Sequence, residues 1–223
     1  QASPGSCPVL AAAGGGGYSL YGTNLTIRDN VATTTGGGLQ GGRAESSVIE
    51  RNVANGLGGG GAWAATILYS LIVSNRAAGA SGAGGGVNGC TVDSCAFVDN
   101  YATTFGEDSF NSTVRNCTLL NTNAAPPVVQ WSAAPSAVIA NTLIVHATAT
   151  QILDNAAAVW TNVAANYFTN SADGLFLPDD PPYRLPPGSQ AIDAGDNAFA
   201  VYGLDLYGRS RVLNGVVDVG AVE

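Results

Sequence analysis

Short apolar–polar stretches recur at nearly equal intervals along the first hundred residues. Each copy places an apolar residue three positions before an asparagine. The copies are Ile27-Arg28-Asp29-Asn30, Ile49-Glu50-Arg51-Asn52, Ile72-Val73-Ser74-Asn75 and Phe97-Val98-Asp99-Asn100. Successive asparagines lie 22, 23 and 25 residues apart. A fixed period of this length predicts stacked supersecondary units.

Positions three and five residues before each asparagine have period-two spacing, so they share one face of a short strand. They are Ile27, Ile49, Ile72 and Phe97, and Leu25, Ser47, Ser70 and Cys95. A second short strand precedes the copy, as in 66–69 and 90–93, and Gly-rich corners separate the copies. Glycine at this density disfavours helices. We therefore predict an all-β fold, a right-handed parallel β-helix.

Looser copies continue the period at 116–120, 141–145 and 158–163, which predicts about seven coils. Residues 14–170 form these coils, and residues 1–13 precede them as an extension or cap. Residues 171–223 are Pro-rich, so we expect them to cover the last coil as a capping segment of the same domain, because an open coil exposes unpaired backbone.

The repeated asparagines are expected at a corner of each coil, where asparagine tolerates a left-handed backbone. In stacked coils their amides form a hydrogen-bonded ladder. This ladder comprises Asn30, Asn52, Asn75 and Asn100. The alternative is a row of amides that binds a ligand, and we prefer the structural interpretation.

The charge balance excludes some partners. The chain has no Lys, 8 Arg and 16 acidic residues, for a net charge of −8. It therefore offers no basic patch for nucleic acid. No apolar run reaches the ~20 residues that span a bilayer. The sequence opens at Gln1 without an initiator Met, so we expect a mature protein that is secreted to the extracellular space or the cell surface.

The even number of cysteines fits a disulfide-permissive compartment. The coil alignment puts Cys117 over Cys95 at ~5 Å, within the range for a disulfide, and by elimination we pair Cys7 with Cys90. Three sequons make Asn24, Asn111 and Asn116 candidate glycosylation sites. In the alignment, Asn24 and Asn116 point outward.

The C-terminal motifs provide a resemblance. Tyr183-Arg184-Leu185, Gly188-Ser189, 191–195 (AIDAG) and 218–223 (DVGAVE) resemble the tail of secreted right-handed parallel β-helix proteins, including bacterial proteins with a choice-of-anchor Q domain. The Phe-x-x-Asn and Gly-Gly repeats resemble those of chlamydial polymorphic outer membrane proteins. The resemblance implies export, surface display and adhesion, with no shared catalytic residues.

Parallel β-helices also include enzymes that act on polysaccharides, which need converging carboxylates. In the alignment, Asp29 and Asp99 lie three coils apart, and Glu45 and Asp93 lie two coils apart with Leu68 between them. We expect His146 to be solvated at a corner. The aspartates of the tail are expected to cap backbone groups rather than bind calcium; they are Asp193, Asp196, Asp205 and Asp218. We therefore predict no enzyme, cofactor or metal.

The aromatic residues occupy several columns of this alignment, which neither supports nor excludes a site for sugar stacking. They are Tyr18, Tyr21, Trp63, Tyr69 and Tyr101. A carbohydrate-binding module or a polysaccharide lyase or hydrolase is the alternative function. Our preferred hypothesis is a non-catalytic structural or adhesive surface protein that self-associates into filaments or contacts a cell surface or its glycans. Residues 1–13 would then add a strand to a neighbouring subunit.

Overall fold

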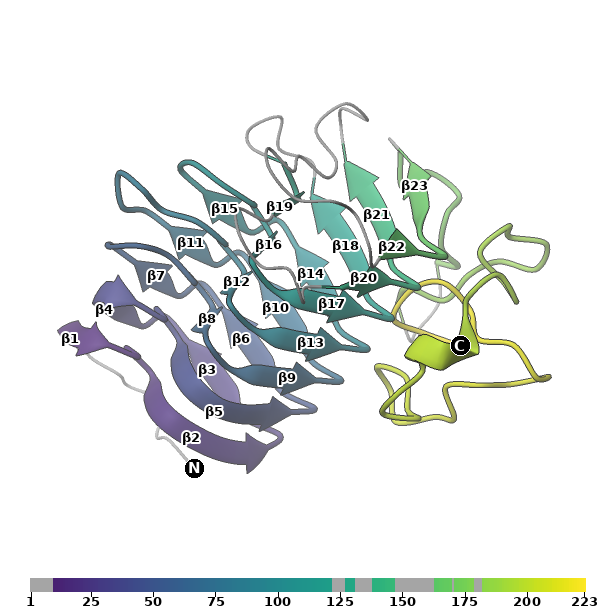
Figure 1. Cartoon of the computed structure of the whole chain (residues 1–223), viewed down its shortest axis with the longest axis horizontal. Helices are drawn as coiled ribbons and strands as arrows, with labels where there is room; N and C mark the ends of the chain where they lie inside the picture. Colours follow the sequence, from purple (N-terminus) through teal and green to yellow (C-terminus); the bar gives the residue numbers. More distant parts are fainter. Residues whose placement is uncertain (1–9, 122–126, 131–137, 147–162, 170, 179–181) are drawn as a thin grey trace.

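The computed structural model describes residues 10–121, 127–130, 138–146, 163–169, 171–178 and 182–223. These residues are all-β, apart from one 3₁₀ turn, η2 (Asn197–Phe199). Every strand pair is parallel, and the strands stack as a β-solenoid (Figure 1). The predicted fold class is therefore confirmed.

Three sheets make the walls of the solenoid. The seven-stranded sheet contains β3 (Thr26–Arg28), β6 (Val48–Glu50), β10 (Leu71–Val73), β14 (Ala96–Val98), β18 (Thr118–Asn121), β21 (Leu143–His146) and β23 (Tyr167–Thr169). The five-stranded sheet contains β1 (Leu10–Ala13), β4 (Val31–Thr35), β7 (Val53–Ala54), β11 (Arg76–Ala77) and β15 (Tyr101–Ala102).

The third sheet follows a bent wall, where the long strands β2 (Gly17–Thr23) and β5 (Leu39–Glu45) each run across the bend. Beyond β5 the sheet divides into two stacks. One contains β8 (Ala62–Trp63), β12 (Val87–Asn88), β16 (Ser109–Phe110) and β19 (Val129–Gln130). The other contains β9 (Thr66–Leu68), β13 (Thr91–Asp93), β17 (Thr113–Arg115), β20 (Ile139–Ala140) and β22 (Val163–Ala164).

We number the coils 1 to 7 by the strands of the seven-stranded sheet, from β3 to β23. Only five strands stack in the smallest sheet, so the described residues build about five complete turns. That is slightly fewer than the seven coils that we predicted, and the class of fold is the same.

The seven-stranded sheet contributes one apolar residue per coil to the bore of the solenoid, where it packs with residues of the third sheet. In register the residues of the seven-stranded sheet are Ile27, Ile49, Ile72, Phe97, Leu119, Ile144 and Phe168. The first six are at most 5% exposed, whereas Phe168 in coil 7 is 42% exposed. The apolar column is therefore open to solvent at the last coil.

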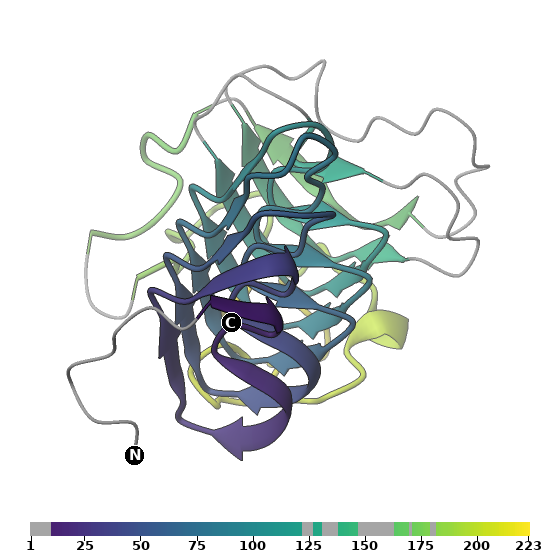
Figure 2. The same ribbon diagram turned by 90° about the vertical axis from the view of Figure 1, so that its left-hand side faces the viewer.

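A left-handed residue turns the chain between the third sheet and the seven-stranded sheet in every coil, with φ between 45° and 54°. We call this set the corner column; its members are Asn24, Ser46, Tyr69, Ser94, Asn116, Asn141 and Ala165. The repeated corner gives the coils the same outline when they are viewed end-on (Figure 2).

Residues 182–223, which we call the tail, lie along the side of the solenoid (Figure 1). Tail residues Leu206, Ala221 and Val222 pack with Ala96 on the outer face of the seven-stranded sheet. We predicted that this Pro-rich region would cover the last coil. The described tail packs along the outer face of the solenoid, and Ala191 and Val219 form an apolar cluster with Leu143, against which Tyr167 of the last coil packs.

Candidate functional site

The four repeated asparagines form a continuous amide ladder inside the solenoid. Nδ2 of Asn30, Asn52 and Asn75 donates to Oδ1 of the asparagine in the next coil, at 2.9, 2.9 and 3.0 Å. Each acceptor also receives the backbone N–H of its predecessor. Asn52, Asn75 and Asn100 are fully buried. These amides satisfy one another and are not arranged for a ligand.

The ladder ends on a carboxylate. Nδ2 of Asn100 donates to Oδ1 of Asp108 at 2.8 Å. In earlier coils the chain position of Asp108 is a glycine, and a Cβ on Gly38 or Gly61 would lie within about 3.1 Å of a ladder asparagine. Coil 5 therefore replaces the third glycine of a Gly-Gly-Gly stretch with an acid that takes the place of the next asparagine.

The neighbouring residue breaks the same pattern. Glu107 stands where earlier coils carry Gly37, Gly60 and Gly85, and it is fully buried. Within the described part of the chain, both of its carboxylate oxygens, and Oδ2 of Asp108, have no hydrogen-bond partner. Burial raises the pKa of Glu107 to about 7, with Asp99 adding to the effect. Burial also raises the pKa of Asp108 well above its ordinary value.

His146 lies beside this pair, with Nε2 3.8 Å from Oε2 of Glu107. The expectation that His146 is solvated was wrong, because its side chain is fully buried. The imidazole occupies the end of β21, opposite Asn121 of β18. The sequence reasoning missed Glu107 and Asp108. The available signal was the change from Gly-Gly-Gly to Gly-Glu-Asp at one repeat position.

Cys90, Cys95 and Cys117 are buried and carry free thiols. The predicted bond Cys95–Cys117 is therefore not made, although the two residues lie in adjacent coils as predicted. The predicted bond Cys7–Cys90 is not made either, and Cys7 lies outside the described residues. Burial raises the pKa of Cys90 to about 11 and that of Cys95 well above its ordinary value.

The thiols take the place of hydroxyl groups at a turn. Ser47 and Ser70 each donate to the carbonyl two residues earlier, at 2.6 Å, and each accepts a backbone N–H from the preceding coil. Cys95 makes the same two contacts with its sulfur. Each thiol therefore already has local hydrogen-bond partners without a disulfide.

The candidate glycosylation sites differ in exposure. Asn24 is exposed, and Asn111 is half-buried. The expectation that Asn116 points outward was wrong, because it is fully buried. Its Nδ2 donates to Asp93 and to the carbonyl of Phe199 in the tail, both at 2.9 Å. The tail covers the corner that would otherwise present this side chain.

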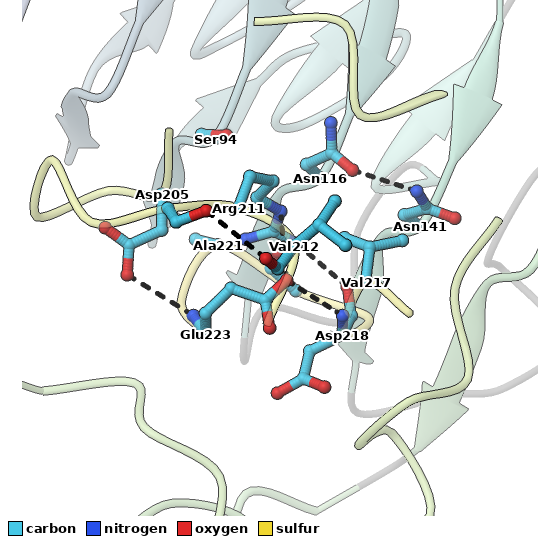
Figure 3. Close-up of polar contacts among 12 residues, drawn as sticks. Ser94, Asn116, Asn141, Asp205, Arg211, Val212, Val217, Asp218, Ala221 and Glu223 are labelled. Atoms are coloured by element: carbon cyan, nitrogen blue, oxygen red, sulfur yellow. Dashed lines mark hydrogen bonds and ion pairs between the residues drawn. The ribbon is translucent and has the colours of Figure 1, made fainter. Parts of the chain in front are cut away.

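The tail is bound by side chains of the corner column. Tyr69, Ser94, Asn116 and Asn141 each donate to a tail carbonyl, those of Tyr202, Leu204, Phe199 and Asp196. The four distances lie between 2.7 and 3.0 Å. Figure 3 shows Asn116 and Asn141 joined across adjacent coils beside the tail.

Arg211 organises the inside of the tail (Figure 3). Its guanidinium is fully buried and donates through Nη2 to the carbonyls of Asp218, at 2.8 Å, and Gly220. Nε lies 3.9 Å from the Glu223 carboxylate, whose pKa burial raises to about 7. These contacts close the tail on itself, so they have a structural role.

The tail aspartates accept backbone N–H groups. Asp205 accepts from Tyr207 and Arg209, Asp218 accepts from Asp193, and Asp196 caps η2. Within the described part of the chain, no group of three or more His, Cys, Asp or Glu residues could hold a metal ion.

The carboxylates that we weighed as a catalytic pair have other partners. Oδ1 of Asp29 lies 2.8 Å from Nε of Arg51. Glu45 pairs with Arg43. Asp93 is buried, lies 3.4 Å from Arg115 and accepts from Asn116. Charge pairing within and between coils therefore accounts for Asp29, Glu45 and Asp93.

The fold defines the chain as a parallel β-solenoid with a laterally packed tail. A scan of the sequence against models of protein families finds no match, and a search of curated proteins finds none. The likeness of the repeats and of the tail to known families therefore stays a prediction. Among the described residues, no helix has the length and apolar character needed to cross a membrane.

Proposed function

We propose that this chain is a non-catalytic, secreted structural subunit that assembles end to end at or outside the cell surface. The observation that carries the proposal is the open last coil. Phe168 continues a column whose other six members are at most 5% exposed, yet it is 42% exposed itself. Covering it requires a surface shaped like another coil.

The first coil of a second copy has that shape. Among the described strands, β2 pairs only with β5, so its other edge can accept a parallel strand. The contact between two consecutive coils is already repeated along this chain, and a further copy would continue the same register. Head-to-tail contacts of this kind do not close and so produce filaments.

The pairing of the acidic groups supports the non-catalytic part of the proposal. Glycoside hydrolysis needs two carboxyl groups about 5 to 9.5 Å apart on an accessible face. The adjacent acids Glu107 and Asp108 are fully buried, which removes them from a polymeric substrate. A new reducing or unsaturated end after incubation with pectin or alginate would contradict this part.

The assembly is tested with Phe168→Asp, because a charge at the open column prevents apolar stacking. Phe105→Asp is the matched control, since Phe105 is 40% exposed but lies outside the bore column. We expect light scattering and electron microscopy to show filaments for the full chain and for Phe105→Asp, and single subunits for Phe168→Asp. Full-length protein that stays monomeric at high concentration would overturn the assembly proposal.

A further inference from the structure

The outer face of the third sheet carries one residue per coil in strict register. We call this set the outer column; its members are Tyr18, Gln40, Trp63, Asn88, Phe110 and Gln130. Each member points outward, because the residue before it faces the bore, as Leu39, Ala62 and Val87 do. The column runs along the axis of the solenoid through coils 1 to 6.

Aromatic rings and amides alternate along this column. Tyr18, Trp63 and Phe110 occupy the odd coils, and the three amides occupy the even coils. Packing of the bore does not require this order, because outward side chains do not reach the bore. They contact only the side chains of the neighbouring coils. Asn88 and Gln130 are only 5% and 6% exposed, so the alternation can be offered to a partner only where its members reach the surface.

A glycine with positive φ precedes each of the first five members by four residues. The pairs are Gly14–Tyr18, Gly36–Gln40, Gly59–Trp63, Gly84–Asn88 and Gly106–Phe110. A Cβ on Gly59 would stand 3.1 Å from Cβ of Trp63. Gly59 therefore leaves backbone without a side chain beside Trp63.

The accessible part of the column lies in coils 1 to 3. Tyr18 is 70% exposed, and Gln40 and Trp63 are partly exposed. Oε1 of Gln40 accepts from the Thr35 hydroxyl at 3.0 Å, which holds this amide between the two rings. Two rings with an oriented amide between them form a short linear platform.

The spacing of the rings selects the chemistry of the partner. Coils stack at about 4.8 Å, so rings two coils apart lie about 10 Å from each other. An extended β-linked hexopyranose chain repeats over two sugars at close to this distance, because alternate sugars are turned over. The apolar C–H face of every second sugar can then pack on a ring face, and the amide between can bond hydroxyl groups.

The negative charge of the chain disfavours anionic polysaccharides as partners. The outer column contains no ionisable group except the phenol of Tyr18, and the chain has a net charge of −8. A uronic acid polymer would be repelled by this charge. The surface therefore fits a neutral β-linked glycan.

We propose that Tyr18, Gln40 and Trp63 form a binding site for a neutral, extended β-1,4-linked polysaccharide that runs along the solenoid axis. The two aromatic residues stack on alternate sugars, and Gln40 bonds the sugar between them. This site does not depend on the assembly proposed above, because it lies on a side wall of a single chain.

The test measures binding of cellohexaose, mannohexaose and chitohexaose to the full chain by calorimetry. We expect at least one of them to bind, and Tyr18→Ala and Trp63→Ala each to weaken that binding at least tenfold. Trp63→Phe keeps a ring and should retain most of it. Tyr21→Ala is the matched control, since Tyr21 lies on the same strand and is 74% exposed but belongs to another column.

Circular dichroism and thermal unfolding confirm that each variant is folded before binding is compared. The proposal is overturned if none of the three neutral oligosaccharides binds, or if Tyr21→Ala loses as much binding as Trp63→Ala. Tighter binding of α-linked maltohexaose or of hexagalacturonate would also overturn it, because the first lacks the extended repeat and the second is anionic.

Discussion

Serine, cysteine and threonine are interchangeable at one turn of this solenoid because all three can donate to a carbonyl two residues earlier. Ser70, Cys95, Cys117 and Thr142 do so in four consecutive coils. The raised pKa of Cys95 keeps its thiol protonated, as the donor role requires. A cysteine at this position therefore serves to stabilise the turn and does not need a disulfide partner.

Cys95→Ser should therefore be tolerated. We expect the free energy of unfolding in urea to change by less than about 1 kcal/mol, because the hydroxyl can make the contacts of the thiol. Cys95→Ala, the matched control, removes both contacts and should cost more. If Cys95 were instead bonded to Cys117, Cys95→Ser would cost about 2 to 4 kcal/mol, and mass spectrometry under non-reducing conditions would show the linked peptides.

The ladder asparagines predict a gradient of stability costs. Asn75 has donors and acceptors on both sides, two of them on Asn52 and one on Asn100, and it is fully buried. Asn75→Ala should cost about 4 kcal/mol, since it leaves several buried groups without partners. Asn30→Ala at the ladder's first rung should cost about 1 kcal/mol. Equal costs in chemical denaturation would contradict the ladder as the cause.

At the scale of elements, coil 5 differs from the four coils before it. Two acids replace two glycines there, and Asp99, Asp108 and His146 are the titratable groups that face Glu107. A carboxyl group with a raised pKa in the folded state binds its proton more tightly folded than unfolded. Folding is then favoured at low pH and loses that contribution as the pH rises.

For Glu107 the relevant window runs from its ordinary pKa of 4.5 to about 7. We expect the free energy of unfolding to fall by up to about 3 kcal/mol across this window, and Asp108 acts with the same sign. Glu107→Gln should flatten this dependence and stabilise the protein at pH 8. The exposed Asp173→Asn is the control. Denaturation curves between pH 4 and 8.5 that are unchanged by Glu107→Gln would contradict this account.

The sequence repeat predicted the strands correctly because each repeated position has a single structural role. Ile49, Ile72 and Phe97 must face the bore, and the asparagine that follows each of them joins the ladder. The left-handed turn that we expected at these asparagines is made by the residue before each of them, since Arg51, Ser74 and Asp99 have φ of 50°, 52° and 47°. Glu107 and Asp108 escaped this reasoning, since they depart from the repeat and the reasoning followed the repeat. The docking of the tail could not be predicted from the sequence either. Tyr69 and Ser94 carry no signal in the sequence that distinguishes them from other polar residues.

At the scale of the whole molecule, the tail adds contacts that the coils alone do not have. It reaches Tyr69 in coil 3 and Asn141 in coil 6 through its own backbone carbonyls. Its fold depends on Arg211, the largest fully buried side chain among the described residues. The tail therefore combines its own internal contacts with contacts to coils 3 to 6.

Arg211→Ala should release the tail. The change leaves the buried carbonyls of Asp218 and Gly220 without their donor and removes the charge that lies 3.9 Å from the Glu223 carboxylate, at a cost of about 3 to 5 kcal/mol. Arg209→Ala, two residues away and exposed, should cost less than about 1 kcal/mol. Limited proteolysis should cut the tail of Arg211→Ala first. Equal resistance of both variants would refute the anchoring role of Arg211.

The laterally packed tail also affects the order in which the coils should unfold. Stacked repeats normally interact only with their nearest neighbours, so an array of them can unravel one rung at a time. Here the tail is hydrogen-bonded to four consecutive coils, through Tyr69, Ser94, Asn116 and Asn141. The corner residues of coils 1 and 2, Asn24 and Ser46, are exposed. Coils 3 to 6 should melt as one cooperative block, and fraying should begin at the amino-terminal end.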